Sequence, residues 1–258
     1  MSIFIAAFDE TESSAGQFTL GGFIGPRADW RDHFSPAWCE RVLAGPPAIP
    51  YLHMTDIRND DWCRKHRITQ TEAARRLDEA VRVIASTRSL CPIRASIDVA
   101  GFQTLLSQPL KKLGGFGNIT KYPDYLAFIA FTVFTLRFVK DVIPEATRVD
   151  LLAEESQKTT QTLRGFHGHL QDTMSKFPTE VARLFGRFSS AGKESIPLQA
   201  ADVFCWHLQR AHAGRLRRQD SIRLAKMTAR LGPQCEITAE DVEAYSGQLQ
   251  SEIVRRTR

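Results

Sequence analysis

Three acidic positions, far apart in the sequence, have the type and setting that suit a divalent cation. Asp9 ends one apolar, β-rich run, the pair Glu154 and Glu155 ends another, and Asp202 lies in an apolar helical segment. Like charges held close together repel, so such carboxylates cluster only with protons or cations between them. Hard cations such as Mg2+ or Mn2+ prefer oxygen ligands and keep waters for substrate phosphates. Two such ions can activate a water and stabilise the leaving oxygen of a phosphodiester.

Asp202 is the most informative of these acids. It lies in the segment Ile196-Pro-Leu-Gln-Ala-Ala-Asp-Val-Phe-Cys-Trp-His207, where a carboxylate is costly unless it is paired or binds a metal. Ala200 and Ala201 leave space beside it, and Gln199 lies one turn earlier on the same side of the helix. The alternative is that Asp202 belongs to the solvent-exposed stripe of an amphipathic helix, just as an acid at a strand end is often only a turn or cap residue.

A second group of candidates contains His53, Asp56 and Lys193. His53 and Asp56 form an HxxD pair after a Pro-rich turn, where the histidine can position a phosphate, carry a proton or ligate a metal. Lys193 precedes the helix of Asp202 and can contact a phosphate. The alternatives are a histidine that only hydrogen-bonds across its segment and an ordinary loop lysine. Glu10, beside Asp9, is a further candidate acid.

The elements that must position these residues follow from periodicity and turn signals. An apolar helix is expected from Pro123 to Ile143, and a capping box at Thr69–Glu72 begins an earlier helix. Without the two helices between Asp29 and Ser86, the order is hairpin, strand, helix, strand, helix, strand, helix. The expected ranges are a hairpin over 3–24, helices over 29–43, 69–86, 123–143, 156–176 and from 197, strands over 92–99, 148–153 and 183–189, and a last helix over 238–256.

Composition limits the classes of protein. The 258 residues carry a net charge of +5, with 43% hydrophobic and 24% charged residues, which is typical of a globular chain. Its five scattered cysteines include no CxxC pair, which favours a reduced, cytoplasmic protein without a zinc ribbon. The N-terminus lacks the pattern of a signal peptide. The apolar stretch 125–136 is too short to cross a bilayer, so no membrane association is expected.

Four short motifs carry a resemblance to a known family, namely Phe8-Asp9-Glu10-Thr11, Leu20-Gly-Gly-Phe-Ile24, Leu52-His53-Met54-Thr55-Asp56 and Ile196-Pro-Leu-Gln199-Ala-Ala-Asp202. They resemble the characteristic blocks of the bacterial domain-of-unknown-function family numbered 3800, over residues 3 to about 212. That family resembles ribonuclease-H-like proteins, whose acidic residues lie on the first strand, a middle strand and the final helix. The chain departs from the family pattern in reading Asp-Glu-Thr-Glu at 9–12 instead of Asp-Glu-Ser-Gly.

The resemblance implies the fold and the site residues. It implies an α/β fold with a ribonuclease-H-like mixed sheet flanked by helices, over residues 1–212, with a helical insertion at 29–90. Residues 213–258 would be a basic helical extension. It also implies Asp9 and Asp202 as metal ligands, with Glu154 as the middle acid. Adjacent strand residues point to opposite faces, so only one of Glu154 and Glu155 is expected to reach the site.

Two functions remain open from the sequence. The first is divalent-metal-dependent phosphodiester hydrolysis, most simply by a nuclease, in which Asp9, Glu154 and Asp202 hold Mg2+ or Mn2+. The alternative is a binding or sensor module on the same scaffold that contacts nucleic acid or protein without turnover. The basic residues between Arg215 and Arg230 suit a nucleic-acid backbone, but they equally suit a solvated helix face. No GxSxG or HExxH motif is present, which disfavours serine-esterase and zincin chemistry.

Overall fold

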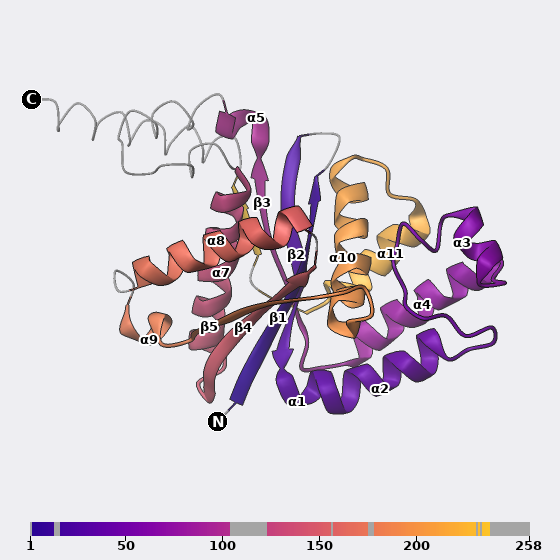
Figure 1. Ribbon diagram of the computed structural model, residues 1–258, viewed down its shortest axis with the longest axis horizontal. Helices are drawn as coiled ribbons and strands as arrows, with labels where there is room; N and C mark the ends of the chain where they lie inside the picture. Colours follow the sequence, from indigo (N-terminus) through magenta and orange to yellow (C-terminus); the bar gives the residue numbers. More distant parts are fainter. Residues whose placement is uncertain are drawn as a thin grey trace, which may run out of the picture.

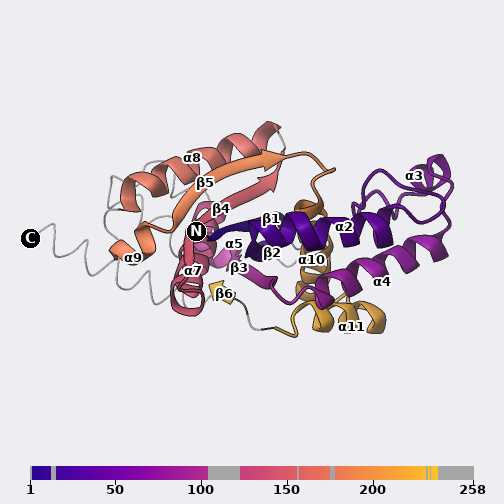
Figure 2. The same cartoon turned by 90° about the horizontal axis from the view of Figure 1, so that it is seen from below.

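The protein is built on a six-stranded mixed sheet flanked by helices, as the sequence predicts at this level of detail. The computed structural model describes residues 2–12, 16–103, 123–155, 157–174, 178–230, 232 and 234–237. The strand order is β5-β4-β1-β2-β3-β6, which can be followed from one edge to the other in Figure 2. The strands are β1 (Ser2–Glu12), β2 (Gln17–Pro26), β3 (Cys91–Asp98), β4 (Ala146–Glu154), β5 (Phe185–Ala191) and β6 (Gln234–Ile237).

The centre of the sheet is the hairpin expected from the first two apolar runs. β1 pairs with β2 in antiparallel fashion and with β4 in parallel fashion. β2 continues antiparallel to β3, while β5 runs parallel to β4. Since β1, β4 and β5 are parallel, their carboxyl ends lie at the same edge region of the sheet, where strand-end side chains come together.

Each face of the sheet has its own hydrophobic core, and the alternation of β1 separates the two. Phe8 belongs to the core under α7 (Pro123–Val142) and α8 (Gln157–Thr173). Ala7 belongs to the core under α10 (Ile196–His212). Figure 1 shows α7 and α8 on one side of the sheet and α10 with the helical insertion on the other. α8 is the helix expected over 156–176 and is continuous over its described residues.

The insertion between β2 and β3 is helical, as expected, and is part of the core beneath α10. It begins with a continuous helical run of α1 (Arg27–Asp29), η1 (Trp30–Phe34), α2 (Ser35–Trp38) and η2 (Cys39–Leu43), in which η1 and η2 are π-helical. This run starts at Arg27, two residues before the start expected at residue 29. α3 (Asp60–Lys65) and α4 (Gln70–Ser86) follow.

Two polar anchors fix the insertion. Thr69 Oγ1 accepts the backbone N–H of Glu72 at 3.1 Å and so caps α4, while the Glu72 carboxylate pairs with Arg75 at 2.7 Å. The fully buried Arg76 donates to the carbonyl oxygens of Gly45 at 2.7 Å and Pro47. Buried backbone acceptors need such partners, so Arg76 holds the turn after η2 against α4.

The region after residue 212 is joined to the main fold. α11 (Arg218–Met227) packs against α4 and α10. β6, which the sequence did not predict, pairs in parallel with β3 and extends the sheet. Residues 213–237 are therefore not only a basic helical extension. Short connections α5 (Val99–Gly101) and α9 (Thr179–Ala182) complete the described elements. The expected last helix over 238–256 and the glycine-rich segment 114–117 lie outside the described residues.

None of the described helices combines the length and the apolar character that a bilayer-spanning segment needs. The apolar helix expected over 123–143 is α7, and ten of its residues are buried against the sheet and its neighbours.

Candidate functional site

The three candidate acids face the same side of the sheet. Phe8 pairs with Ala153 across the parallel strands, so Asp9 and Glu154 each follow at the next position. Phe8 and Ala153 both belong to the core under α7. Because successive strand residues alternate in direction, Asp9 and Glu154 both face the α10 side. We call Asp9, Glu154 and Asp202 the acidic cluster.

Asp202 reaches this region because α10 lies unusually close to β2. Gly21 pairs with Asp9, and a Cβ added to Gly21 would stand 2.9 Å from the Cys205 sulfur. The glycine therefore permits a close approach of helix and strand that a larger residue would obstruct. Cys205 also donates from its thiol to the backbone carbonyl oxygens of Asp9 and Gly21, at 3.3 Å each.

The segment after the insertion's first helical run supplies another wall of the site. The Asp202 Oδ2 atom accepts the backbone N–H of Met54 at 2.6 Å, and Asp202 is only 9% exposed. On the sheet side, Asp9 Oδ1 accepts the backbone N–H of Glu10 at 2.8 Å. Each carboxylate thus has one oxygen bound to the backbone. Asp202 does not lie in a solvent-exposed stripe.

The electrostatics of the acidic cluster favour a proton or a cation between its members. Burial, followed by the charges of Glu154 and Glu10, raises the pKa of Asp9 to about 7. Burial, followed by the charges of Asp9 and Glu154, raises the pKa of Asp202 well above its usual value. The charge of Glu154 acts on both aspartates, and the charge of Asp9 acts on Asp202, so the three carboxyl groups lie close enough to interact. In the described part of the chain, neither Asp9 nor Asp202 forms an ion pair with lysine or arginine.

The second group of candidates also comes together beside the acidic cluster. His53 Nδ1 lies 3.2 Å from Asp56 Oδ2 and 3.4 Å from Lys193 Nζ, and Lys193 pairs with Asp56 at 3.3 Å. We call His53, Asp56 and Lys193 the histidine cluster. Burial and then the charge of Lys193 lower the pKa of His53, so its imidazole is neutral at pH 7. Burial disfavours the charged form of Lys193 and acts to lower its pKa. The hydrogen bond and charge of Asp56 outweigh burial, so the pKa of Lys193 is raised.

Glu154 connects the two clusters. Its charge acts on His53 and Lys193 as well as on Asp9 and Asp202. β5 pairs Ala191 with Glu154, so the following residues, including Lys193, leave the sheet beside this carboxylate. The arrangement therefore places four acidic side chains, an imidazole and an ammonium group within one site.

The remaining sequence candidates lie outside this group. Glu155 is exposed, follows the end of β4 and acts on neither aspartate. Glu10 is exposed and alternates to the face opposite Asp9. Gln199 is buried, and its amide bonds Trp38, Leu52 and the carbonyl of Lys193 at 2.8–3.0 Å. Gln199 therefore connects α10 to the insertion and to the loop that contains Lys193. Its role is to position these segments.

Sequence reasoning did not single out Cys205. Its signal was available, because it follows Asp202 by three residues and therefore lies on the same side of α10. The basic residues between Arg215 and Arg230 were expected to contact a nucleic-acid backbone or to form a solvated helix face, but not all of them are at the surface. Arg223 is buried and pairs with Asp220 at 3.0 Å and Asp78 at 2.8 Å. Arg230 donates to backbone carbonyls at the end of α4.

Oxygen ligands suitable for Mg2+ or Mn2+ are present, but the acids do not form a closed ligand cage. Among the described residues, no group of three or more His, Cys, Asp or Glu side chains is arranged to hold a metal ion by itself. Asp9 and Asp202 each keep one carboxylate oxygen that no described hydrogen bond uses. Magnesium sites commonly use one or two carboxylates and complete their shell with water and substrate oxygens. The donor set fits that open type of site.

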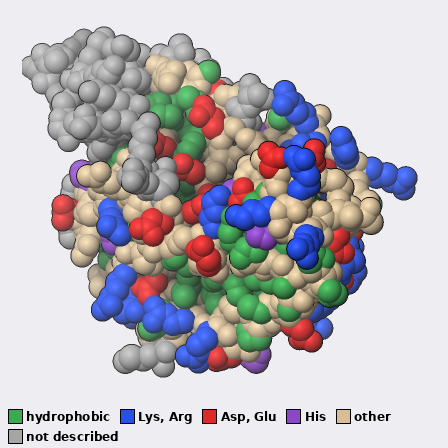
Figure 3. Space-filling model, turned by 45° about the vertical axis from the view of Figure 1, so that its right-hand side comes forward, with side chains coloured by type: hydrophobic (Ala, Val, Ile, Leu, Met, Phe, Trp, Pro, Cys, Tyr) green, Lys and Arg blue, Asp and Glu red, His purple; other side chains and the backbone are tan. Residues whose placement is uncertain are grey.

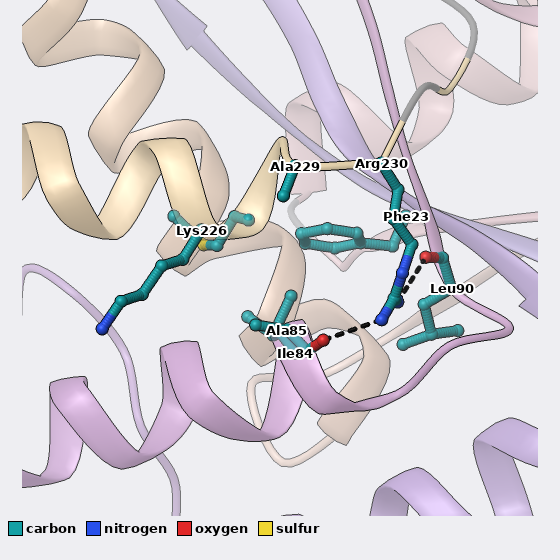
Figure 4. A pocket seen from close by; sticks show the side chains of 8 residues that line it. Phe23, Ile84, Ala85, Leu90, Lys226, Ala229 and Arg230 are labelled. Carbon is teal, nitrogen blue, oxygen red and sulfur yellow. Dashed lines mark hydrogen bonds between the residues drawn. The ribbon is translucent and has the colours of Figure 1, made fainter.

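The surface around this region mixes both signs of charge. Figure 3 shows acidic, basic and histidine side chains side by side near the centre of the face turned forward. A separate cavity of about 210 Å3 lies between β2, α4 and the segment after α11. Figure 4 shows Arg230 closing part of it through bonds to backbone carbonyls. None of its lining residues belongs to the acidic or the histidine cluster.

Comparisons with family models, with curated protein sequences and with solved structures gave no match to this chain.

Proposed function

We propose that the acidic cluster binds one or two divalent cations, Mg2+ or Mn2+, and that the protein hydrolyses phosphodiester bonds in nucleic acid. The convergence of Asp9, Glu154 and Asp202, from β1, β4 and α10, carries this proposal. First strand, middle strand and late helix are the positions implied by the resemblance to family 3800 and ribonuclease-H-like proteins. A bound cation would stabilise the charge of the reacting phosphate and lower the pKa of water.

The chain's own groups have distinct parts in this proposal. The Met54 N–H fixes one oxygen of Asp202 and leaves the other for a ligand. Lys193 carries a positive charge beside Glu154, where it can attract a phosphate oxygen. In the tautomer in which His53 Nδ1 donates to Asp56, the Nε2 lone pair can accept a proton from water during hydrolysis.

The decisive variant is Asp202→Asn, because asparagine keeps an oxygen that can accept the Met54 N–H but removes the charge. We expect divalent-dependent cleavage to fall by at least about 1,000-fold, as for the loss of a central electrostatic group. Single- and double-stranded DNA and RNA should be tested with and without Mg2+ and Mn2+. Asp141→Asn, on the exposed side of α7, is the matched control and should keep full activity.

Equal cleavage by Asp202→Asn and by the unaltered protein would refute the assignment, provided the variant unfolds at no lower denaturant concentration than the unaltered protein. The alternative is a binding or sensor module that does not turn over. The absence of a closed ligand group in the described residues favours it. This alternative predicts nucleic-acid binding that neither divalent cation addition nor Asp202→Asn changes, with no cleavage of any substrate.

A further inference from the structure

The segment 52–58 runs along α10 in register with its turns. The Leu52 N–H bonds Gln199, the Met54 N–H bonds Asp202, and the Arg58 guanidinium lies 4.1 Å from the centre of the Trp206 ring. The Arg210 guanidinium lies 4.6 Å from the same ring. We call Arg58, Trp206 and Arg210 the arginine–tryptophan patch. It begins one helical turn beyond Asp202.

Arg58 is positioned but not neutralised. Its side chain is exposed and makes no hydrogen bond or ion pair within the described part of the chain. Contact with an indole face holds the guanidinium by attraction to the ring while its N–H donors remain available. A planar guanidinium with free donors matches the geometry of phosphate oxygens.

Further positive charge surrounds Arg58. The groups whose charges act on it are Asp220 and three arginines, Arg210, Arg217 and Arg223. Arg223 is already paired with Asp220 and Asp78. Asp220 is buried, and Arg210 stands 3.9 Å from it. The charges of Arg58 and the exposed Arg217 therefore remain without a carboxylate contact among the described residues, which makes the patch electropositive.

The distances along α10 suit a chain of phosphates. At about 1.5 Å per residue, Trp206 lies about 6 Å and Arg210 about 12 Å beyond Asp202. Successive phosphates on one strand of a duplex are about 3.4 Å apart along its axis. A strand whose scissile phosphate reaches the acidic cluster would therefore present a neighbouring phosphate, about two to four nucleotides away, to the patch.

The geometry points to the arginine–tryptophan patch as a binding subsite for the sugar–phosphate backbone of a nucleic-acid strand that extends from the acidic cluster along α10. This inference rests on the proposed function, and it makes the substrate a polynucleotide, not a mononucleotide. The contacts are to phosphate, so they select a polyanionic strand without selecting its base sequence.

Binding without turnover tests the inference independently of hydrolysis. The full chain is titrated in EDTA with fluorescein-labelled 15-nucleotide single-stranded DNA and RNA at several salt concentrations. Arg58→Ala should weaken binding about tenfold and reduce the slope of log affinity against log salt by about 0.7. Arg58→Lys should recover part of the affinity, because it keeps the charge without the planar fork.

Arg137→Ala is the matched control, since it removes one exposed arginine from α7 on the other side of the sheet. It should leave the affinity and the slope of log affinity against log salt unchanged. Arg217→Ala removes a second arginine near the patch and should also weaken binding. Equal affinities for Arg58→Ala and Arg137→Ala would overturn the inference. So would the absence of oligonucleotide binding at 50 mM salt, which is about a third of the physiological ionic strength.

The results separate the two proposals. Binding that depends on Arg58 but is never followed by divalent-dependent cleavage would leave the subsite standing and remove the proposed hydrolysis. Cleavage that depends on Asp202 but not on Arg58 would support the hydrolysis and remove the subsite.

Discussion

Two of the buried aspartates, Asp150 on the sheet and Asp202 on the helix that packs against it, have opposite surroundings. Asp150, on β4, accepts from Arg27 at 2.6 Å, from Arg148 at 3.1 Å and from the Arg187 N–H at 3.0 Å. Asp202 accepts only the Met54 N–H among the described hydrogen bonds, and the nearest charges on it include two further acids. Both carboxyls are less than a tenth exposed.

The difference is the one expected between a structural carboxylate and the metal-binding carboxylate that we propose for Asp202. Breaking a buried ion pair leaves an uncompensated charge, so Asp150 stabilises the fold through its arginines. The acidic cluster has no such compensation and must take up protons or a cation to remain in place. The same residue type therefore has opposite consequences for stability at the two locations.

The largest expected effect on stability is at Asp150. Asp150→Asn keeps the shape of the side chain but leaves Arg27 and Arg148 without their carboxylate. We expect a loss of about 3 kcal/mol in the free energy of unfolding, at the lower end for broken buried pairs because both arginines are partly exposed. Urea unfolding at pH 8 measures it. A loss below about 0.5 kcal/mol would show that the two regions do not differ as described.

A divalent cation should stabilise the folded protein by binding at the acidic cluster and nowhere else. At a free Mg2+ or Mn2+ concentration 100 times the dissociation constant, binding to the folded state adds about 2.7 kcal/mol of stability. Thermal unfolding at pH 8 should show this gain in the unaltered protein and in Asp150→Asn, but not in Asp9→Asn. The same gain in all three proteins would place the cation elsewhere.

The smallest effect concerns the proton at Asp9. Its pKa is raised to about 7 by folding, so the associated stability is complete below the ordinary value near 3.8 and is lost as the pH rises to about 7. Without divalent cations, the stability of Asp9→Asn relative to the unaltered protein should therefore be about 2 to 3 kcal/mol greater at pH 8 than at pH 5. Urea unfolding at both values measures the difference, and a pH-independent difference would contradict it.

Local periodicity predicted most of the elements correctly. The hairpin, α4, α7, β3, β4 and α10 follow from apolar alternation, helical spacing and caps, all of which act between residues near in sequence. β6 was missed because a four-residue edge strand has too little pattern of its own and forms by pairing with β3.

The site was only partly predictable. Strand alternation predicted that one of Glu154 and Glu155 would reach the site, but the choice required the register between β1 and β4. The pairing of His53, Asp56 and Lys193 joins segments about 140 residues apart, and the apposition of Arg58 with Trp206 joins equally distant ones. Such contacts depend on how α10 and the insertion pack, which no local pattern specifies.

The hydrogen bond from Met54 to Asp202 has a consequence for engineering. The insertion supplies that donor, and its tryptophans fill the hydrophobic layer on which α10 rests. A minimal version that joined β2 directly to β3 would strip one carboxylate of its backbone partner and open the layer to water. Trimming should therefore begin in α3, which lies at the outer end of the insertion in Figure 1, and should spare residues 49–58.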